Sequence, residues 1–114
     1  MNAWAQRHRE ALESALEHDE TLRGAERVMA TNRRRASRSL PRGGFVIGVT
    51  DRRIVIWRSS TWLSRPLDVA TSWTFHEGVA LAAAPLGRLR LLLPDRSIVT
   101  LRRFGGRSLR HLAR

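Results

Sequence analysis

The sequence predicts one α+β domain that is mainly β: a partly open barrel or sandwich of about seven antiparallel strands, with an N-terminal helix and a short C-terminal helix. Three observations predict this class. Short runs of β-branched, aromatic and leucine residues recur at regular spacing, with turn residues between them. Only the first part of the chain has a clearly helical composition. The length of 114 residues leaves room for one domain with one core.

The N-terminal segment predicts a helix over residues 3–23, because helix-forming residues dominate it and no proline interrupts it. Gly24 stands where a glycine commonly ends a helix. We therefore divide the chain into an acidic amphipathic helix over residues 1–24 and a β domain over residues 25–114. Glutamates at three- and four-residue spacing share one face of the helix: Glu10, Glu13, Glu17 and Glu20. We expect a solvated face, with contact to a basic surface of the same chain or of a neighbour as the alternative.

The clearest β element is a hairpin. Residues 45–50 and 53–58 are rich in β-branched and aromatic side chains, as strands are. Asp51 and Arg52 between them supply a tight turn. Because aspartate and threonine hydrogen-bond nearby backbone groups in turns, we expect turn chemistry here, and not a functional pair of Asp51 with Arg52.

The other predicted strands have similar compositions and are bounded by turn or loop residues: 26–31, 71–76, 79–83, 88–93 and 97–103. Residues 66–69 are expected to form a turn that leads into the strand at 71. In residues 88–93 arginine alternates with leucine, which predicts one wet face and one buried face. Gly105 and Gly106 end the last strand, and residues 107–113 are expected to form the short final helix.

The charge of the chain is strongly positive and unevenly spread. The net charge is +11, and all 21 basic residues are arginine. Residues 1–26 hold six acids against three arginines, a net of −3, whereas residues 27–114 hold 18 arginines against four acids, a net of +14. Arginine suits forked contacts to phosphate or carboxylate, and a GC-rich genome would produce the same excess. The sequence leaves both explanations open.

Known catalytic and metal-binding patterns are absent from the sequence. It holds no cysteine, no Gly-x-Ser-x-Gly segment and no lysine for a phosphate-binding loop. No two histidines stand three or four residues apart: His8, His18, His76 and His111. The four carboxylates after residue 26 fall at predicted turns: Asp51, Asp68, Glu77 and Asp95. We therefore expect no catalysis, no metal, no cofactor and no small-molecule substrate.

Residues 44–57, GFVIGVTDRRIVIW, resemble a hairpin of bacterial pleckstrin-homology-like (PH-like) domains, which are related to GRAM domains. In that hairpin a glycine and a hydrophobic run lead into Thr-Asp-Arg-Arg and a second hydrophobic run. Residues 22–30 are similar to the opening strand of such domains, and residues 65–69 to the Pro-Leu step before their middle strands. The turn at residues 95–96 occupies the place of their last hairpin. The resemblance covers residues 20–114 and implies a non-catalytic binding module in a bacterial protein.

The first candidate binding surface is the basic loop over residues 32–44. The resemblance places this loop between the first two strands, and its positive charge alone favours non-specific contact with an anionic lipid or nucleic-acid surface. The candidate contacts are Arg33, Arg34, Arg35, Arg38 and Arg42. Family members that bind phosphoinositides also use basic residues on the next strand, and residues 45–49 carry none. A solvated basic loop is the alternative.

The second candidate surface is the loop tip at residues 59–64, where an aromatic residue stands between arginines. We expect it to contact a partner or a membrane through four residues: Arg58, Trp62, Leu63 and Arg65. Packing of the tip against the core or contact with a protein partner is favoured over the membrane, because isolated exposed apolar residues are common.

For function, we expect an adaptor that docks a protein partner or associates with itself, with an anionic membrane surface as a further candidate. The alternative is a basic protein that binds nucleic acid non-specifically, although the sequence holds no helix-turn-helix or aromatic RNA-binding signature. Charged residues occur throughout residues 1–25, and the longest apolar stretch, 79–86, is much shorter than a membrane span. We therefore expect a cytoplasmic protein, or one peripheral to the inner face of the membrane.

Overall fold

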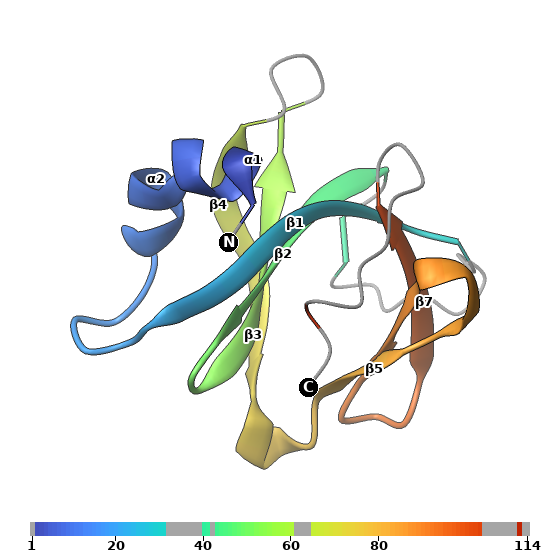
Figure 1. Ribbon diagram of the computed structural model, residues 1–114. Coiled ribbons are helices and arrows are strands. Elements are labelled where there is room, and N and C mark those ends of the chain that lie inside the picture. Colours follow the sequence, from blue (N-terminus) through green and yellow to red (C-terminus); the bar gives the residue numbers. More distant parts are fainter. Residues whose placement is uncertain (1, 32–39, 42, 61–64, 104–111, 113–114) are drawn as a thin grey trace.

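The computed structural model of the chain describes residues 2–31, 40–41, 43–60, 65–103 and 112 (Figure 1). Seven antiparallel strands form one sheet in the order β4-β3-β2-β1-β7-β6-β5. The strands are β1 (Leu22–Ala30), β2 (Gly44–Thr50), β3 (Arg53–Ser59), β4 (Pro66–Thr74), β5 (Ala80–Ala83), β6 (Leu89–Leu92) and β7 (Ile98–Arg103). The prediction of a mainly β domain with seven antiparallel strands is confirmed.

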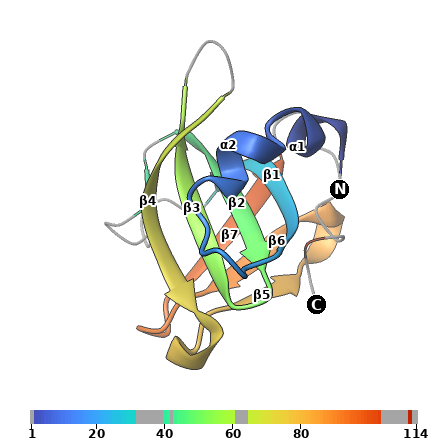
Figure 2. The same cartoon turned by 90° about the vertical axis from the view of Figure 1, so that its left-hand side faces the viewer.

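The sheet bends at β1, which takes part in both of its halves. β1 pairs with β2 along most of its length, and its last residues, Val28 to Ala30, also pair with β7. Figures 1 and 2 show the result: β2, β3 and β4 lie on one side of the molecule and β5, β6 and β7 on the other. The main hydrophobic core lies between the two halves and includes Val28, Ile47, Ile56 and Leu101.

The predicted helix over residues 3–23 is wrong in its extent. Two helices of five residues each replace it, α1 (Ala3–Arg7) and α2 (Arg9–Glu13), and β1 begins already at Leu22. Helix propensity is outweighed here because residues 14–21 turn back toward the sheet, where Glu20 reaches Arg53. The expected boundary at residue 24 consequently falls inside β1.

Gly24 does not end a helix. It lies buried in β1, where a Cβ atom would stand 2.9 Å from Cδ2 of Leu112. The glycine therefore permits the close approach of Leu112, the one residue of the expected final helix 107–113 that the structure describes. That helix otherwise lies outside the described residues.

The hairpin of β2 and β3 is confirmed, with Val46 opposite Trp57 and Val49 opposite Ile54. The expected turn at residues 66–69 is wrong, because β4 begins at Pro66 and pairs with β3 from Ser59 onward. β4 also ends earlier than expected, at Thr74. There Glu77 Oε1 accepts from the backbone N and Oγ1 of Thr74, while the Thr74 side chain accepts from the backbone N of Glu77. This capping box starts the 3₁₀ turn η2 (Phe75–Glu77).

A second hydrophobic cluster lies on the outer face of the sheet, beneath α1 and α2 (Figure 2). Trp4 and Leu12 of the helices pack there against Val46, Val55 and Trp57 of β2 and β3. Asn2 holds the first helix in place, because its Oδ1 accepts from Ala5 N at 2.7 Å while its Nδ2 donates to Ala25 O. The N-terminal segment is therefore a structural part of the domain that covers one outer face.

Candidate functional site

The acidic N-terminal segment meets the two arginines of the β2–β3 turn. Glu20 has a side chain with no solvent exposure, and its Oε2 lies 2.9 Å from Arg53 Nε. Arg53 also donates to Ser72 Oγ at 3.1 Å and to Ala15 O at 3.3 Å. Arg53 thus fixes the N-terminal segment against β3 and β4.

Arg52 holds the more exposed acids of the same segment. Its guanidinium nitrogens lie 2.9 Å from Glu17 Oε2 and 2.6 Å from Asp19 Oδ2. The hydrogen bond from Arg52 holds the pKa of Asp19 below its usual value. For Glu17 and Glu20 of the acidic face, the alternative interpretation is therefore correct: they contact a basic surface of the same chain.

The turn chemistry expected of Thr50 is confirmed, whereas the Asp51 side chain hydrogen-bonds the distant backbone of Thr21. Thr50 Oγ1 accepts from the backbone N of Arg52 and of Arg53, both at 3.0 Å, and donates to Glu20 Oε2 at 2.6 Å. Asp51 Oδ1 accepts from Thr21 N at 3.0 Å. These hydrogen bonds satisfy the turn and also tie it to the entry of β1.

Burial and hydrogen bonding act in opposite directions on Glu20. Burial of its carboxyl group raises the pKa, whereas hydrogen bonds from Arg53, Thr50 and the backbone of Glu17 lower it, and the net result is a pKa of about 2. The carboxylate is therefore ionised at any pH near neutrality. It acts as a fixed anionic anchor for Arg53.

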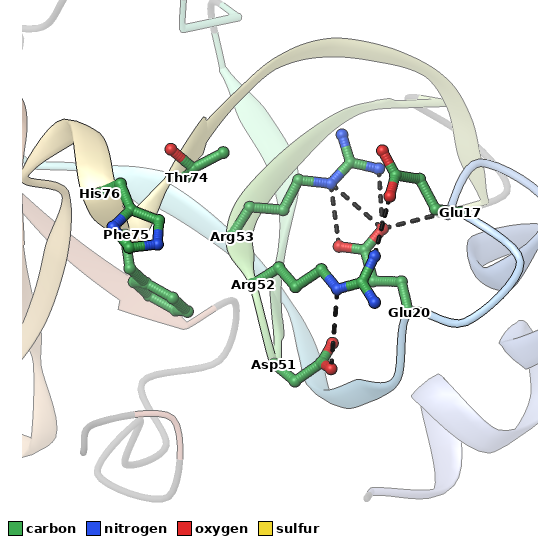
Figure 3. Close-up of a pocket in the computed structure, with 8 residues that line it drawn as sticks. All are labelled: Glu17, Glu20, Asp51, Arg52, Arg53, Thr74, Phe75 and His76. Atoms are coloured by element: carbon green, nitrogen blue, oxygen red, sulfur yellow. Dashed lines mark hydrogen bonds and ion pairs between the residues drawn. The ribbon is translucent and has the colours of Figure 1, made fainter.

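A groove of about 480 Å³ lies beside this cluster (Figure 3). Eight residues line it: Glu17, Glu20, Asp51, Arg52, Arg53, Thr74, Phe75 and His76. Its carboxylates and guanidinium groups hydrogen-bond one another or the turn, as Figure 3 shows for Arg52 and Arg53. Within the described ranges no group of three or more histidine or acidic residues is placed to hold a metal ion. The groove is best explained as a structural junction.

The second outer face belongs to β5, β6 and β7, and we call it the β5–β7 face. Leu81, Leu89, Leu91, Val99 and Leu101 point into the core. Because side chains alternate along a strand, the residues between them point outward: Ala80, Ala82, Arg90, Leu92, Ile98, Thr100 and Arg102. Five of these are exposed, and Leu92 and Thr100 are half-buried. In the part of the chain that the structure describes, no helix covers this face.

Two arginines of the β5–β7 face lie side by side. Arg90 is paired with Thr100, and Arg102 is the next outward residue of β7, so their Cα atoms are diagonal neighbours at roughly 7–8 Å. Among the described residues, no ion pair involves either arginine. Two neighbouring arginines give this face a local positive charge, which makes it a candidate for binding an anionic partner.

The two predicted binding surfaces are described only in part. The arginines of the basic loop lie outside the described residues: Arg33, Arg34, Arg35, Arg38 and Arg42. Trp62 and Leu63 also lie outside them. Arg58 is exposed and paired with Asp68 at 2.5 Å, and Arg65 N donates to Ser60 Oγ at 3.0 Å.

The sequence analysis did not select Arg90 and Arg102, although a signal for them was present. The alternation of arginine and leucine over residues 88–93 predicted a wet face, and Arg90 is on it. The position of Arg102 beside Arg90 depends on the register in which β6 pairs with β7, and the spacing of residues in the sequence does not define that register.

No helix in the described ranges is long and apolar enough to span a membrane. Comparisons of the chain with protein-family models, with curated protein sequences and with solved structures give no match. The functional argument consequently depends on the geometry of the two outer faces.

Proposed function

We propose that the chain is a non-catalytic binding module with PH-like architecture, which docks an acidic surface of a protein partner through its β5–β7 face. The observation that carries the proposal is the contrast between the two outer faces. The face of β1 to β3 is covered by α1 and α2 and forms a second core. The β5–β7 face is uncovered in the described residues and carries Arg90 and Arg102 without ion-pair partners.

PH-like architecture is proposed from the hairpin sequence, and the seven-stranded antiparallel sheet is compatible with it. A non-catalytic function is supported by the groove at the N-terminal segment, whose charged groups are engaged with one another. Such mutually neutralised groups have a structural role, whereas catalytic groups need to face a substrate.

The composition of the β5–β7 face favours a protein over a nucleic acid. Ile98 is 44% exposed and Leu92 is half-buried, so apolar surface adjoins the arginines. Apolar residues with arginine are typical of protein–protein interfaces. Single-stranded nucleic acids need aromatic side chains for base stacking, and none of the described residues of this face is aromatic.

Binding of three probes at physiological salt tests this proposal. The probes are a synthetic peptide of about eight residues in which glutamate alternates with valine, a DNA duplex, and vesicles of anionic lipid. We expect the peptide to bind with its contacts at Arg90 and Arg102, as mapped by amide chemical shifts. Binding to the duplex should disappear as salt rises toward the physiological range, because it depends on released counterions. Retention of the duplex or the vesicles at physiological salt, without peptide binding, would contradict the proposal.

A further inference from the structure

The sheet has two edges, and only one of them, β4, combines proline, charge and register shifts. β4 begins with Pro66, carries Asp68 in an ion pair with Arg58, and changes register twice along β3. Proline, charge and bulges are the features that protect edge strands. β5 at the other edge is protected only by its length of four residues. Its sequence, Ala-Leu-Ala-Ala from Ala80 to Ala83, has no proline or charge, and its pairing with β6 has no register shift.

The backbone of β5 offers free hydrogen-bonding groups on its outer side. Ala84 N donates to Arg88 O at 2.9 Å, so position 84 is a bonding position of the β5–β6 pair. Every second residue before it, Ala82 and Ala80, therefore also bonds to β6. Because bonding positions alternate in antiparallel pairs, the N–H and C=O groups of Leu81 and Ala83 point away from β6. In the described part of the chain no other strand or turn bonds to them. Three small alanine side chains also leave this edge accessible.

We infer that β5 accepts an extended acidic segment of the protein partner as an added strand of the sheet. This inference rests on the proposed function and names how the partner is held. The segment bonds to the N–H and C=O groups of Leu81 and Ala83, as in other cases where a peptide extends a sheet edge. The backbone bonds supply affinity, and the side chains of the segment supply selectivity.

Arg90 explains why the segment should be acidic. The residue of the added strand that lies opposite Ala82 points outward, as Ala82 does. Ala82 in turn lies opposite Arg90 of β6, so the three side chains form one row across the sheet. Two strand spacings of about 4.8 Å each separate it from Arg90. The methyl group of Ala82 leaves the path open, so the side chains of a glutamate and Arg90 can meet over it. Residues opposite Leu81 and Ala83 point to the core side, where apolar side chains fit.

Amide hydrogen exchange tests the added strand directly. In the free protein the amides of Leu81 and Ala83 should exchange rapidly, while that of Ala82 is protected by its bond to β6. Saturation with the peptide of alternating glutamate and valine should slow exchange at Leu81 and Ala83 by at least about tenfold. Unchanged exchange at both amides in the saturated complex would overturn the inference.

A proline variant provides a second test. Ala83→Pro removes one edge donor without removing a bond to β6, and it should weaken peptide binding about fivefold. Ala83→Ser keeps the N–H group and should bind as the native protein does. A control peptide of the same composition, with its glutamates grouped together, should bind weakly because it cannot place acids on one face and valines on the other.

The outcomes separate the inference from the proposed function. If both peptides bind equally well and Ala83→Pro has no effect, the added strand is wrong and binding by the arginines of the β5–β7 face stands. If neither peptide binds, both proposals are wrong. Selective binding of the alternating peptide, with protection of Leu81 and Ala83, supports both.

Discussion

Glu20 and Arg53 form an ion pair in which the Glu20 side chain is fully buried and the Arg53 side chain is 20% exposed, with Nε and Oε2 2.9 Å apart. The pair joins the N-terminal segment to β3. Thr50 Oγ1 donates to the same carboxylate, so the pair is also part of the β2–β3 turn. Through these contacts a short segment with two brief helices becomes part of the fold.

Removal of one partner of this pair should be strongly destabilising. Arg53→Met leaves the buried Glu20 carboxylate without its cation, and we expect a loss of about 3 kcal/mol in the free energy of unfolding, measured with urea. Arg58→Met removes the exposed pair with Asp68 and should cost less than about 1 kcal/mol. Equal effects of the two variants would contradict the structural role of the buried pair.

The same carboxylate should make stability depend on pH in the acid range. Its pKa is lowered from 4.5 to about 2 in the folded protein, so its stabilising effect is complete above about pH 4.5 and is lost as pH falls through 2. The loss should be on the order of 3 kcal/mol. Urea unfolding at several pH values measures it. Glu20→Gln should be less stable near neutral pH and should lose less stability on acidification; an unchanged slope would contradict the role of Glu20.

The N-terminal helices should contribute to the stability of the whole domain. Leu12 is fully buried against the outer face of the sheet, and Leu12→Ala should lower the free energy of unfolding by about 2–5 kcal/mol. Leu67→Ala makes the same change at a side chain that is 50% exposed and should stay within about 0.5 kcal/mol. A single cooperative transition with a lowered midpoint is expected for Leu12→Ala. A separate early transition would show that the helices fold independently.

Gly48 should be intolerant of a side chain because of Trp57. A Cβ atom at Gly48 would stand 2.5 Å from Cζ3 and 2.9 Å from Cη2 of the buried Trp57 ring. Gly48→Ala should therefore cost about 1–3 kcal/mol in unfolding free energy. In a double-mutant cycle with Trp57→Phe, the alanine should cost clearly less in the phenylalanine background, since the clashing ring atoms are gone. Additive effects would contradict this contact.

The strands were predictable because their signal is local. The hairpin over residues 45–58 needed only β-branched runs around a turn, and tertiary contacts support the same choice. The helix over 3–23 failed because its end is decided by distant groups: Glu20 binds Arg53, 33 residues away in the chain. Composition favours a helix there, and the ion pair and the start of β1 at Leu22 outweigh it.

Only half of the candidate site was predictable from the sequence. The alternation of arginine and leucine in residues 88–93 indicates an exposed row that includes Arg90, because a strand with one buried face alternates polar and apolar residues. The position of Arg102 beside Arg90 and the open edge at β5 depend on strand order and register. The same sequence pattern is compatible with many orders of seven strands, so it defines neither feature. The charge pattern indicated the arginines of the loop at 32–44 instead, and these arginines lie outside the described residues.

The most direct test of the central claim is a comparison of two charge reversals with the same change in net charge. Arg90→Glu with Arg102→Glu alters the β5–β7 face, and Arg7→Glu with Arg23→Glu alters exposed positions in α1 and at the start of β1. Affinity for the peptide of alternating glutamate and valine is measured by fluorescence anisotropy. The β5–β7 variant should lose at least about tenfold, and the matched variant should change less than about twofold. Equal losses would show that net charge alone attracts the peptide, and the proposed docking face would then be wrong.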